Sequence, residues 1–213
     1  MRRILLGMVG LMLFVSGAKA QDYPRVEVFG GYSYGNVGPT AAIGEGRNSV
    51  NGWNASVNAN VNRWFGLASE IGGEYGDFHF TAPAPPIACG TTTPCTIDTK
   101  GTDKYHNFLF GPQFTLRREK VSPFGHFLIG GSHVNETATI TIPVPPSPIF
   151  PIAPNTFTLR TSSTNFAFAT GGGADFKLTQ RIAWRVQADY LQTQINRHTQ
   201  NDVRLVTGLV FRF

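Results

Sequence analysis

The last eleven residues of the chain, Val203 to Phe213, alternate strictly between two kinds of side chain. One set carries mostly the larger apolar groups: Leu205, Thr207, Leu209, Phe211 and Phe213. The other set carries both arginines: Arg204, Val206, Gly208, Val210 and Arg212. A period of two predicts an extended strand whose faces meet different environments. The apolar set continues to the terminal residue, whereas the chain ends of soluble domains usually fray into water.

The first twenty residues are typical of a secretory signal peptide. Arg2 and Arg3 precede an apolar run from Ile4 to Val15, and Ala18-Lys19-Ala20 fits the small-x-small cleavage pattern. The run is shorter than the roughly 20 residues that a membrane-spanning helix needs, and an uncleaved anchor is the alternative. We therefore expect a signal peptide over residues 1–20 and one domain over residues 21–213.

The formal net charge of +5 overstates how basic the mature chain is. Arg2, Arg3 and Lys19 leave with the signal peptide, so 15 basic and 13 acidic residues remain. There is no basic run and no basic patch interleaved with aromatic residues, so we expect no nucleic-acid partner. Charged residues make up 15% of the chain, against about 25% in ordinary soluble domains. Low charge with 24 glycines and 17 phenylalanines favours an all-β chain with part of its surface outside water.

The two cysteines, Cys89 and Cys95, lie six residues apart in a loop. In an exported chain the default is a local disulfide, which would stiffen the loop rather than hold a core. A zinc site is disfavoured because no second pair of cysteines or histidines lies nearby. We expect no metal and no cofactor.

Alternating patterns recur along the chain and predict eight strands with no helix of any length. They cover residues 25–34, 53–61, 65–78, 105–117, 122–134, 165–178, 182–191 and 203–213. Long and short connections alternate, with tight turns at residues 62–64, 118–120 and 179–181, a Pro-rich irregular segment over 135–164, and a last loop of moderate length.

Two of these strands carry features that complicate the pattern. Pro112 lies inside the fourth strand, where it cannot donate to a ladder, so a bulge is expected there. The faces of residues 122–134 cannot be assigned from the pattern, because Phe127 and Ile129 alternate with three other large groups: Phe124, His126 and Leu128.

Alternation alone does not say which face is inside. A soluble lipocalin-like barrel puts the apolar face inside, and a membrane barrel inverts this arrangement. The alternation of long and short connections favours the membrane barrel, as do aromatic residues at strand ends, which suit the membrane interfaces. These are Tyr34, Trp53, Trp64, Phe65, Tyr75, Trp184 and Tyr190. Charges of both signs on the minority face could pair inside a narrow lumen. They are Glu27, Glu70, Glu74, Asp175, Lys177, Arg185, Asp189, Arg204 and Arg212.

With these features, the chain resembles the OmpA-type and opacity-porin-like eight-stranded outer-membrane barrels. The segments VEVFGGYSYG, HNFLFGPQFTLR and SPFGHFLIGGSHV and the terminal strand carry the likeness. It implies an eight-stranded antiparallel up-and-down transmembrane β-barrel with short periplasmic turns and long external loops. It also implies residence in the outer membrane among its lipids, and Phe211 and Phe213 as a signal for the insertion machinery. The peptidoglycan-binding domain of OmpA has no counterpart here, so cell-wall anchoring is not implied.

Three functions are compatible with this pattern. The favoured one is a structural or surface-interaction barrel with at most a narrow ion-permeable pore, because eight strands leave an interior filled by side chains. The loop ligand is not identified. A lipid-modifying enzyme is the second, with candidates His106, His126, Ser132, His133 and Glu136. It is disfavoured because adjacent residues of a strand, such as Ser132 and His133, point to opposite faces. A soluble periplasmic barrel that binds an apolar ligand is the third.

Overall fold

The computed structural model describes residues 23–37, 48–86, 95–142, 155–195 and 198–213. The predicted signal peptide lies outside these ranges. Eight strands form one closed barrel in which each strand is antiparallel to the next and the last pairs with the first. The strands are β1 (Val26–Val37), β2 (Asn48–Asn60), β3 (Phe65–Ala84), β4 (Cys95–Thr115), β5 (Val121–Ile142), β6 (Asn155–Lys177), β7 (Ile182–Ile195) and β8 (His198–Arg212). Within the described residues, no helix is long and apolar enough to cross a membrane.

The register of the β4–β5 pair passes Pro112 unchanged, so the expected bulge is wrong. Phe110 pairs with Ile129 and Gln113 pairs with His126, which leaves no inserted residue on either strand. The ladder only lacks pairs at Gly111 and Pro112, as expected where a proline offers no N–H. On the other side of β4, Pro112 keeps its pairing with Leu67. The missing donor therefore interrupts one ladder locally and leaves the strand intact.

Three short connections join strands at one end of the barrel, near the three predicted tight turns. Between β2 and β3, the side chain of Asn62 accepts hydrogen bonds from the backbone of Trp64 and Phe65. Between β6 and β7, the hydroxyl of Thr179 accepts them from Arg181 and Ile182. Short polar side chains that bond to the backbone two or three residues on favour tight turns.

The strands at the opposite end are longer than the sequence predicts. The segment 135–164 is not irregular, since residues 135–142 of β5 pair with residues 155–162 of β6. The moderate loop expected before the last strand is also wrong, because β7 and β8 pair up to Ile195 and His198. Thr and Ile alternate along residues 139–142 and have high strand propensity. All six prolines of the segment lie within residues 143–154, outside the described residues.

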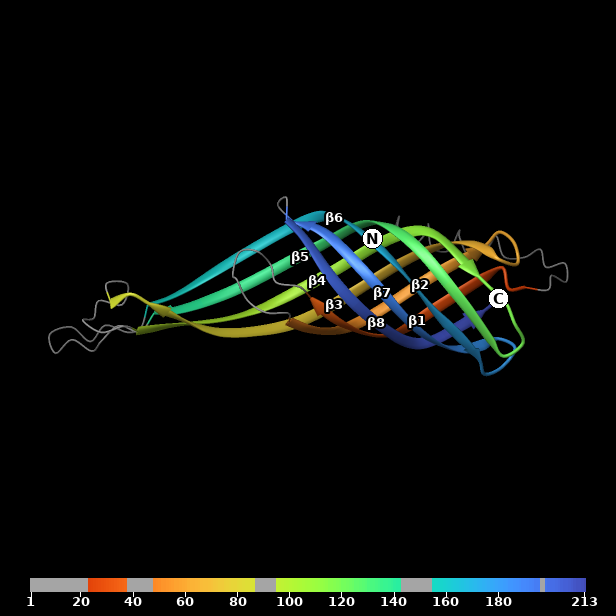
Figure 1. Ribbon diagram of the computed structural model, residues 1–213, viewed down its shortest axis with the longest axis horizontal. Coiled ribbons are helices and arrows are strands. Elements are labelled where there is room, and N and C mark those ends of the chain that lie inside the picture. Colours follow the sequence, from red (N-terminus) through yellow and green to blue (C-terminus); the bar gives the residue numbers. More distant parts are fainter. Residues whose placement is uncertain (1–22, 38–47, 87–94, 143–154, 196–197) are drawn as a thin grey trace, which may run out of the picture.

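Four of the strands continue well beyond the ring of eight. The pairing of β2 with β3 ends at Asn51 and Tyr75, and that of β6 with β7 begins at Ala167 and Thr193. Beyond these points β3, β4, β5 and β6 still pair with one another (Figure 1). We call this four-stranded part, residues 76–84, 95–103, 136–142 and 155–161, the sheet extension.

Most large apolar side chains of the barrel strands point outward, and most polar and charged side chains line the lumen. Val57 and Ile71 are each 44% exposed, whereas Asn54 and Glu70 beside them are almost fully buried. This is the reverse of a lipocalin-like barrel, and the soluble ligand-binding alternative is therefore wrong. The structure also settles the faces of β5. Phe127 and Ile129 point outward, and the inward side chains are those of Phe124, His126 and Leu128.

Candidate functional site

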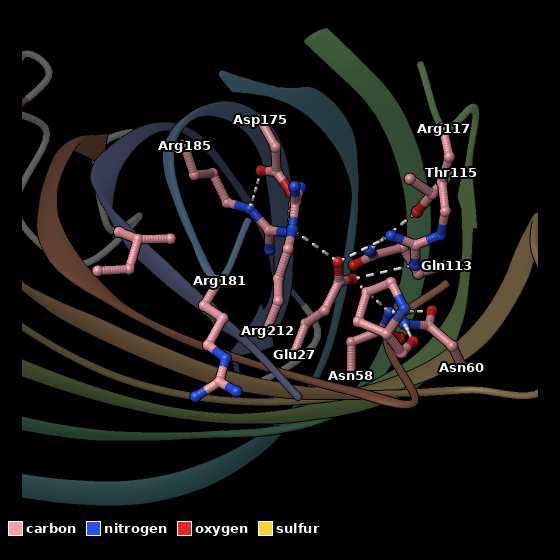
Figure 2. Close-up of polar contacts among 12 residues, drawn as sticks. Glu27, Asn58, Asn60, Gln113, Thr115, Arg117, Asp175, Arg181, Arg185 and Arg212 are labelled. Carbon is pink, nitrogen blue, oxygen red and sulfur yellow. Dashed lines mark hydrogen bonds and ion pairs between the residues drawn. The ribbon is translucent and has the colours of Figure 1, made fainter. Parts of the chain in front are cut away.

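A chain of ion pairs crosses the lumen near the short turns. Arg185 holds Asp175 with two hydrogen bonds of 2.7 and 3.0 Å, and Arg212 reaches the same carboxylate at 3.1 Å. Arg212 also lies 3.2 Å from Glu27, which accepts a 2.9 Å bond from Arg117 (Figure 2). These five residues, which we call the lower network, come from β1, β6, β7, β8 and the segment after β4. Their contacts therefore tie opposite walls of the barrel together.

The lower network is held by further polar and aromatic contacts. The amide of Asn58 donates to Glu27 at 3.3 Å. The guanidinium of Arg185 lies 4.2 Å from the ring centroid of Phe124 and 5.3 Å from that of Phe29. A desolvated cation over an aromatic face gains about 2 kcal/mol. Burial of the charged groups is thus offset by paired charges, hydrogen bonds and aromatic faces.

A second chain of polar contacts lies farther from the short turns. Arg204 bonds to Glu70 on β3 and, at 2.7 Å, to Asp189 on β7. Asp189 also lies 2.9 Å from Nε2 of His126 on β5 and accepts a 2.8 Å bond from Gln187. We call these five residues the middle network. It joins β3, β5, β7 and β8 and spans the lumen a second time.

Apolar side chains fill the lumen beside the middle network. They form a cluster of Ala68, Leu109, Leu128, Ala167, Ala169 and Leu191, each no more than 3% exposed. An eight-stranded barrel has an interior just wide enough for side chains to fill it. Within the part of the chain that the structure describes, the two networks and this cluster fill the lumen and leave no wide aqueous channel.

One strip of the lumen remains suited to water. The side-chain amides of Asn54 and Asn107 are buried and make no hydrogen bond within the described protein, and Nη1 of Arg204 shares this property. Both asparagines pair with Gly72, where an added Cβ would lie 3.5 Å from the Asn54 amide nitrogen. Buried polar groups of this kind are normally satisfied by ordered water. We therefore expect ordered water along this strip of the lumen.

Most charges predicted for the lumen do lie there, but Lys177 does not. The side chain of Lys177 is exposed, because it is the last residue of β6 and the strand ends at the rim. Arg117 was missing from the predicted set, although its side chain is only 10% exposed. Its alternation with Gln113 and Thr115, both lumen residues, is a sequence signal that could have found it. Glu74 accepts a 2.6 Å bond from Ser33.

The aromatic residues predicted for the membrane interfaces lie on the outer surface. Trp64 and Phe65 form a cluster with Phe114 near the short turns, with ring centroids 5.4 to 5.9 Å apart. Phe65 is half-buried, and the other predicted residues are between 39% and 56% exposed. They are Tyr34, Trp53, Trp64, Tyr75, Trp184 and Tyr190. Side chains that are amphipathic and outward-facing suit a bilayer interface.

The candidate catalytic residues are dispersed. His126 belongs to the middle network, and Ser132 is buried in the lumen. His133 points to the other face of β5, where Nδ1 lies 2.8 Å from the hydroxyl of Thr164. His106 packs edge-on against Tyr75 on the outer surface. Across the described residues, no three His, Cys, Asp or Glu side chains are grouped as metal ligands would be.

The final strand closes the barrel through its pairing with β1. Val26 and Phe213 exchange backbone hydrogen bonds of 3.2 and 2.9 Å, and the side chains of Phe211 and Phe213 point outward. Their role as an insertion signal stays a prediction. So does the disulfide, because Cys89 lies outside the described residues.

Two carboxyl groups of the sheet extension have shifted proton affinities. A hydrogen bond from His79 holds the pKa of Asp98 below its usual range. Burial, reinforced by the charges of Glu136 and Asp77, raises the pKa of Asp103 to about 7. Asp103 and Glu136 pair directly across β4 and β5 at the base of the sheet extension.

Comparison with known proteins points to one family. The family model described as "Outer membrane protein beta-barrel domain" matches residues 6–213. The crystal structure of Ail, the attachment invasion locus protein of Yersinia pestis, is similar with a TM-score of 0.50 and 17% identity, over 89% of this chain and 99% of that one. Neisserial surface protein A gives 0.47 and 10%, over 91% and 100%. The N-terminal barrel domain of Pseudomonas aeruginosa OprF gives 0.38 and 10%, over 90% and 100%. The search of curated proteins found no match.

Proposed function

This chain belongs to the outer membrane protein beta-barrel domain family, and from that premise we propose that it serves as a surface-interaction protein. Membership places it in the outer membrane of a Gram-negative cell. Barrels of this kind have short periplasmic turns and longer external connections. The end with the three short turns is then periplasmic, and the sheet extension lies outside the cell.

The observation that carries the proposal is the pair of unpaired edges on the sheet extension. Along β3, pairing with β2 stops at Tyr75, and along β6, pairing with β7 stops at Ala167. Residues beyond these points pair on one side only among the described strands. An exposed strand edge is a template for an added strand, so such edges are usually short, charged or covered. Long external edges favour the binding of extended polypeptide.

The lumen supports at most a narrow pore. The lower network, the middle network and the apolar cluster beside the middle network fill the lumen with packed and paired side chains. Water in the strip near Gly72 would be the route of any leak. Transport of solutes is therefore not part of the proposed function.

Catalysis is not part of it either. A nucleophile needs a base within hydrogen-bond reach. Ser132 points into the lumen while His133 points outward, and His126 is engaged with Asp189. We therefore place a lipid-modifying activity below surface interaction.

The test is selection of peptides on intact cells. A phage-displayed library of random peptides is panned on cells with the full chain and on cells with a trimmed barrel. In the trimmed barrel, one Asn-Gly turn replaces residues 79–100 and joins Phe78 to Gly101, which are paired in the structure. A second Asn-Gly turn replaces residues 138–159 and joins Thr137 to Arg160, which are also paired. Heat-dependent mobility in SDS verifies that the trimmed barrel folds. We expect enrichment that requires the sheet extension, and equal enrichment on both cells would refute the proposal.

A further inference from the structure

The inner face of the sheet extension, which continues the face that lines the lumen, is apolar. Strand pairing aligns its side chains into two rows that run across all four strands. One row contains Phe80, Thr99, Ile140 and Phe157. The next contains Phe78, Gly101, Ala138 and Leu159. This surface lies beyond the membrane, where contiguous apolar side chains mark an interaction site.

Large apolar side chains lie on this face at both edge strands of the sheet extension, β3 and β6. On β3, Phe78 and Phe80 stack with ring centroids 6.3 Å apart. Phe78 lies over Gly101, since an added Cβ there would come within 2.2 Å of its ring. On β6, Phe157 is 53% exposed and Leu159 is 57% exposed. The β6 side is therefore the open side of the face.

An acidic pair borders the two apolar rows. The next row toward the lumen contains Asp103 directly opposite Glu136. Like charges at directly opposed positions of a sheet repel, and an added cation would relieve the repulsion. Burial raises the pKa of Asp103 to about 7, and the negative charge of Glu136 adds to this effect. Lys100 and Lys104 lie three positions before and one position after Asp103. Both are odd spacings, so the two lysines point to the opposite face of β4.

We propose that the inner face of the sheet extension binds a cationic amphipathic peptide, with its apolar side chains against Phe157 and Leu159 and a Lys or Arg against Glu136 and Asp103. The inference rests on the proposed surface-interaction function and names its partner class.

The free edge of β6 sets the pattern of the peptide. A peptide that pairs with β6 places every second side chain on the inner face. Two apolar groups would lie beside Phe157 and Leu159, and the next group on that face would lie beside Thr161. Thr161 pairs with Glu136. Two strand spacings, about 10 Å, then separate the peptide backbone from that of Glu136, and extended Lys and Glu side chains bridge this gap. The pattern is apolar-x-apolar-x-basic.

The experiment uses the full chain in lipid nanodiscs. The probe is a labelled seven-residue peptide with Phe, Leu and Lys at alternating positions and Thr elsewhere, and its binding is followed by fluorescence anisotropy against empty nanodiscs. One comparison peptide carries Glu in place of Lys, and another carries Thr in place of Phe and Leu. We expect the Lys peptide to bind at least about tenfold more tightly than either, with affinity that falls as salt rises.

Variants locate the binding. Asp103→Asn with Glu136→Gln should remove the preference for Lys over Glu, and Phe157→Ser with Leu159→Ser should weaken binding about tenfold. Asp98→Asn is the matched control, because it removes an acidic charge from the opposite face of the same strand, and it should change affinity less than about twofold. Equal affinity for the Lys and Glu peptides, or a preference that survives the double acidic variant, would overturn the inference.

The outcomes separate this inference from the function on which it rests. Peptides selected on cells through the sheet extension but lacking the basic pattern would leave surface interaction standing and overturn the cationic partner. Absence of any selection would overturn both. Concentration-dependent dimers in nanodiscs that Phe157→Ser with Leu159→Ser abolishes would show a second copy as the occupant instead.

Discussion

Replacing Arg204 by methionine should destabilise the barrel strongly. Arg204 is 1% exposed and connects Glu70 with Asp189 across the lumen. Methionine keeps much of the volume but leaves both carboxylates without their shared cation. Asp189 retains His126 and Gln187 as neighbours, whereas the ion pair of Glu70 is with Arg204.

The expected magnitude follows from the burial of the three groups. Removing one partner of a buried ion pair costs about 3–5 kcal/mol, because an uncompensated charge remains. The ordered water expected beside Gly72 would partly solvate the unpaired carboxylates, which places the expected loss near the lower end of that range. Adding Glu70→Gln removes one stranded charge, and the double variant should recover about half of the loss.

The assay is urea unfolding in lipid vesicles, followed by the fluorescence of Trp53, Trp64 and Trp184. Arg160→Met is the control, because Arg160 is exposed on the sheet extension, and it should change the unfolding free energy by less than about 0.5 kcal/mol. A loss below about 1 kcal/mol for Arg204→Met, or no recovery with Glu70→Gln, would refute the role assigned to the middle network.

Three further outcomes are expected. Asp103 holds its proton to about pH 7 in the folded chain but releases it near pH 4 when unfolded. The unfolding free energy should therefore fall as pH rises from about 4 to 7, and Asp103→Asn should flatten that part of its pH profile. Arg185→Leu leaves Asp175 with Arg212 as its remaining cation in the lower network, so it should cost about 2 kcal/mol in the same unfolding assay, less than the ~3–5 kcal/mol for a fully uncompensated charge, and Arg185→Leu with Asp175→Asn should cost less still. Pro112→Val should restore a donor to the β4–β5 ladder and stabilise by about 0.5–1 kcal/mol, with new amide protection at residue 112 in hydrogen exchange; an unprotected amide would contradict it.

The barrel itself was predictable because its strands meet two different environments. Along β2, small and apolar groups alternate with asparagines, and this contrast sets the strand and, with the short turns, the topology. The closing pair of β8 with β1 has no local signal of its own and follows only once the barrel is recognised.

The ends of the strands were not predictable in the same way. Beyond the membrane both faces of a strand can meet water, so the contrast between faces weakens, as in residues 160–164 of β6, which are polar on both faces. The six prolines of residues 143–154 then led to the prediction of an irregular segment over residues 135–164, which is longer than the part that contains the prolines. The alternation of side chains along each strand was enough to predict most of the charged residues that point into the lumen. Pairings such as Arg204 with Glu70, which are 134 residues apart, depend on the strand register, and the sequence alone does not supply it.

Labelling of single cysteines on intact cells tests the central claim most directly: a sheet held outside the cell by a barrel with its short turns in the periplasm. In a background with Cys89→Ser and Cys95→Ser, a membrane-impermeant maleimide is applied to cells carrying Thr158→Cys in the sheet extension or Thr179→Cys in a short turn. The structure predicts labelling of Thr158→Cys on intact cells and of Thr179→Cys only after the outer membrane is permeabilised. Labelling of Thr179→Cys on intact cells, with Thr158→Cys protected, would contradict it.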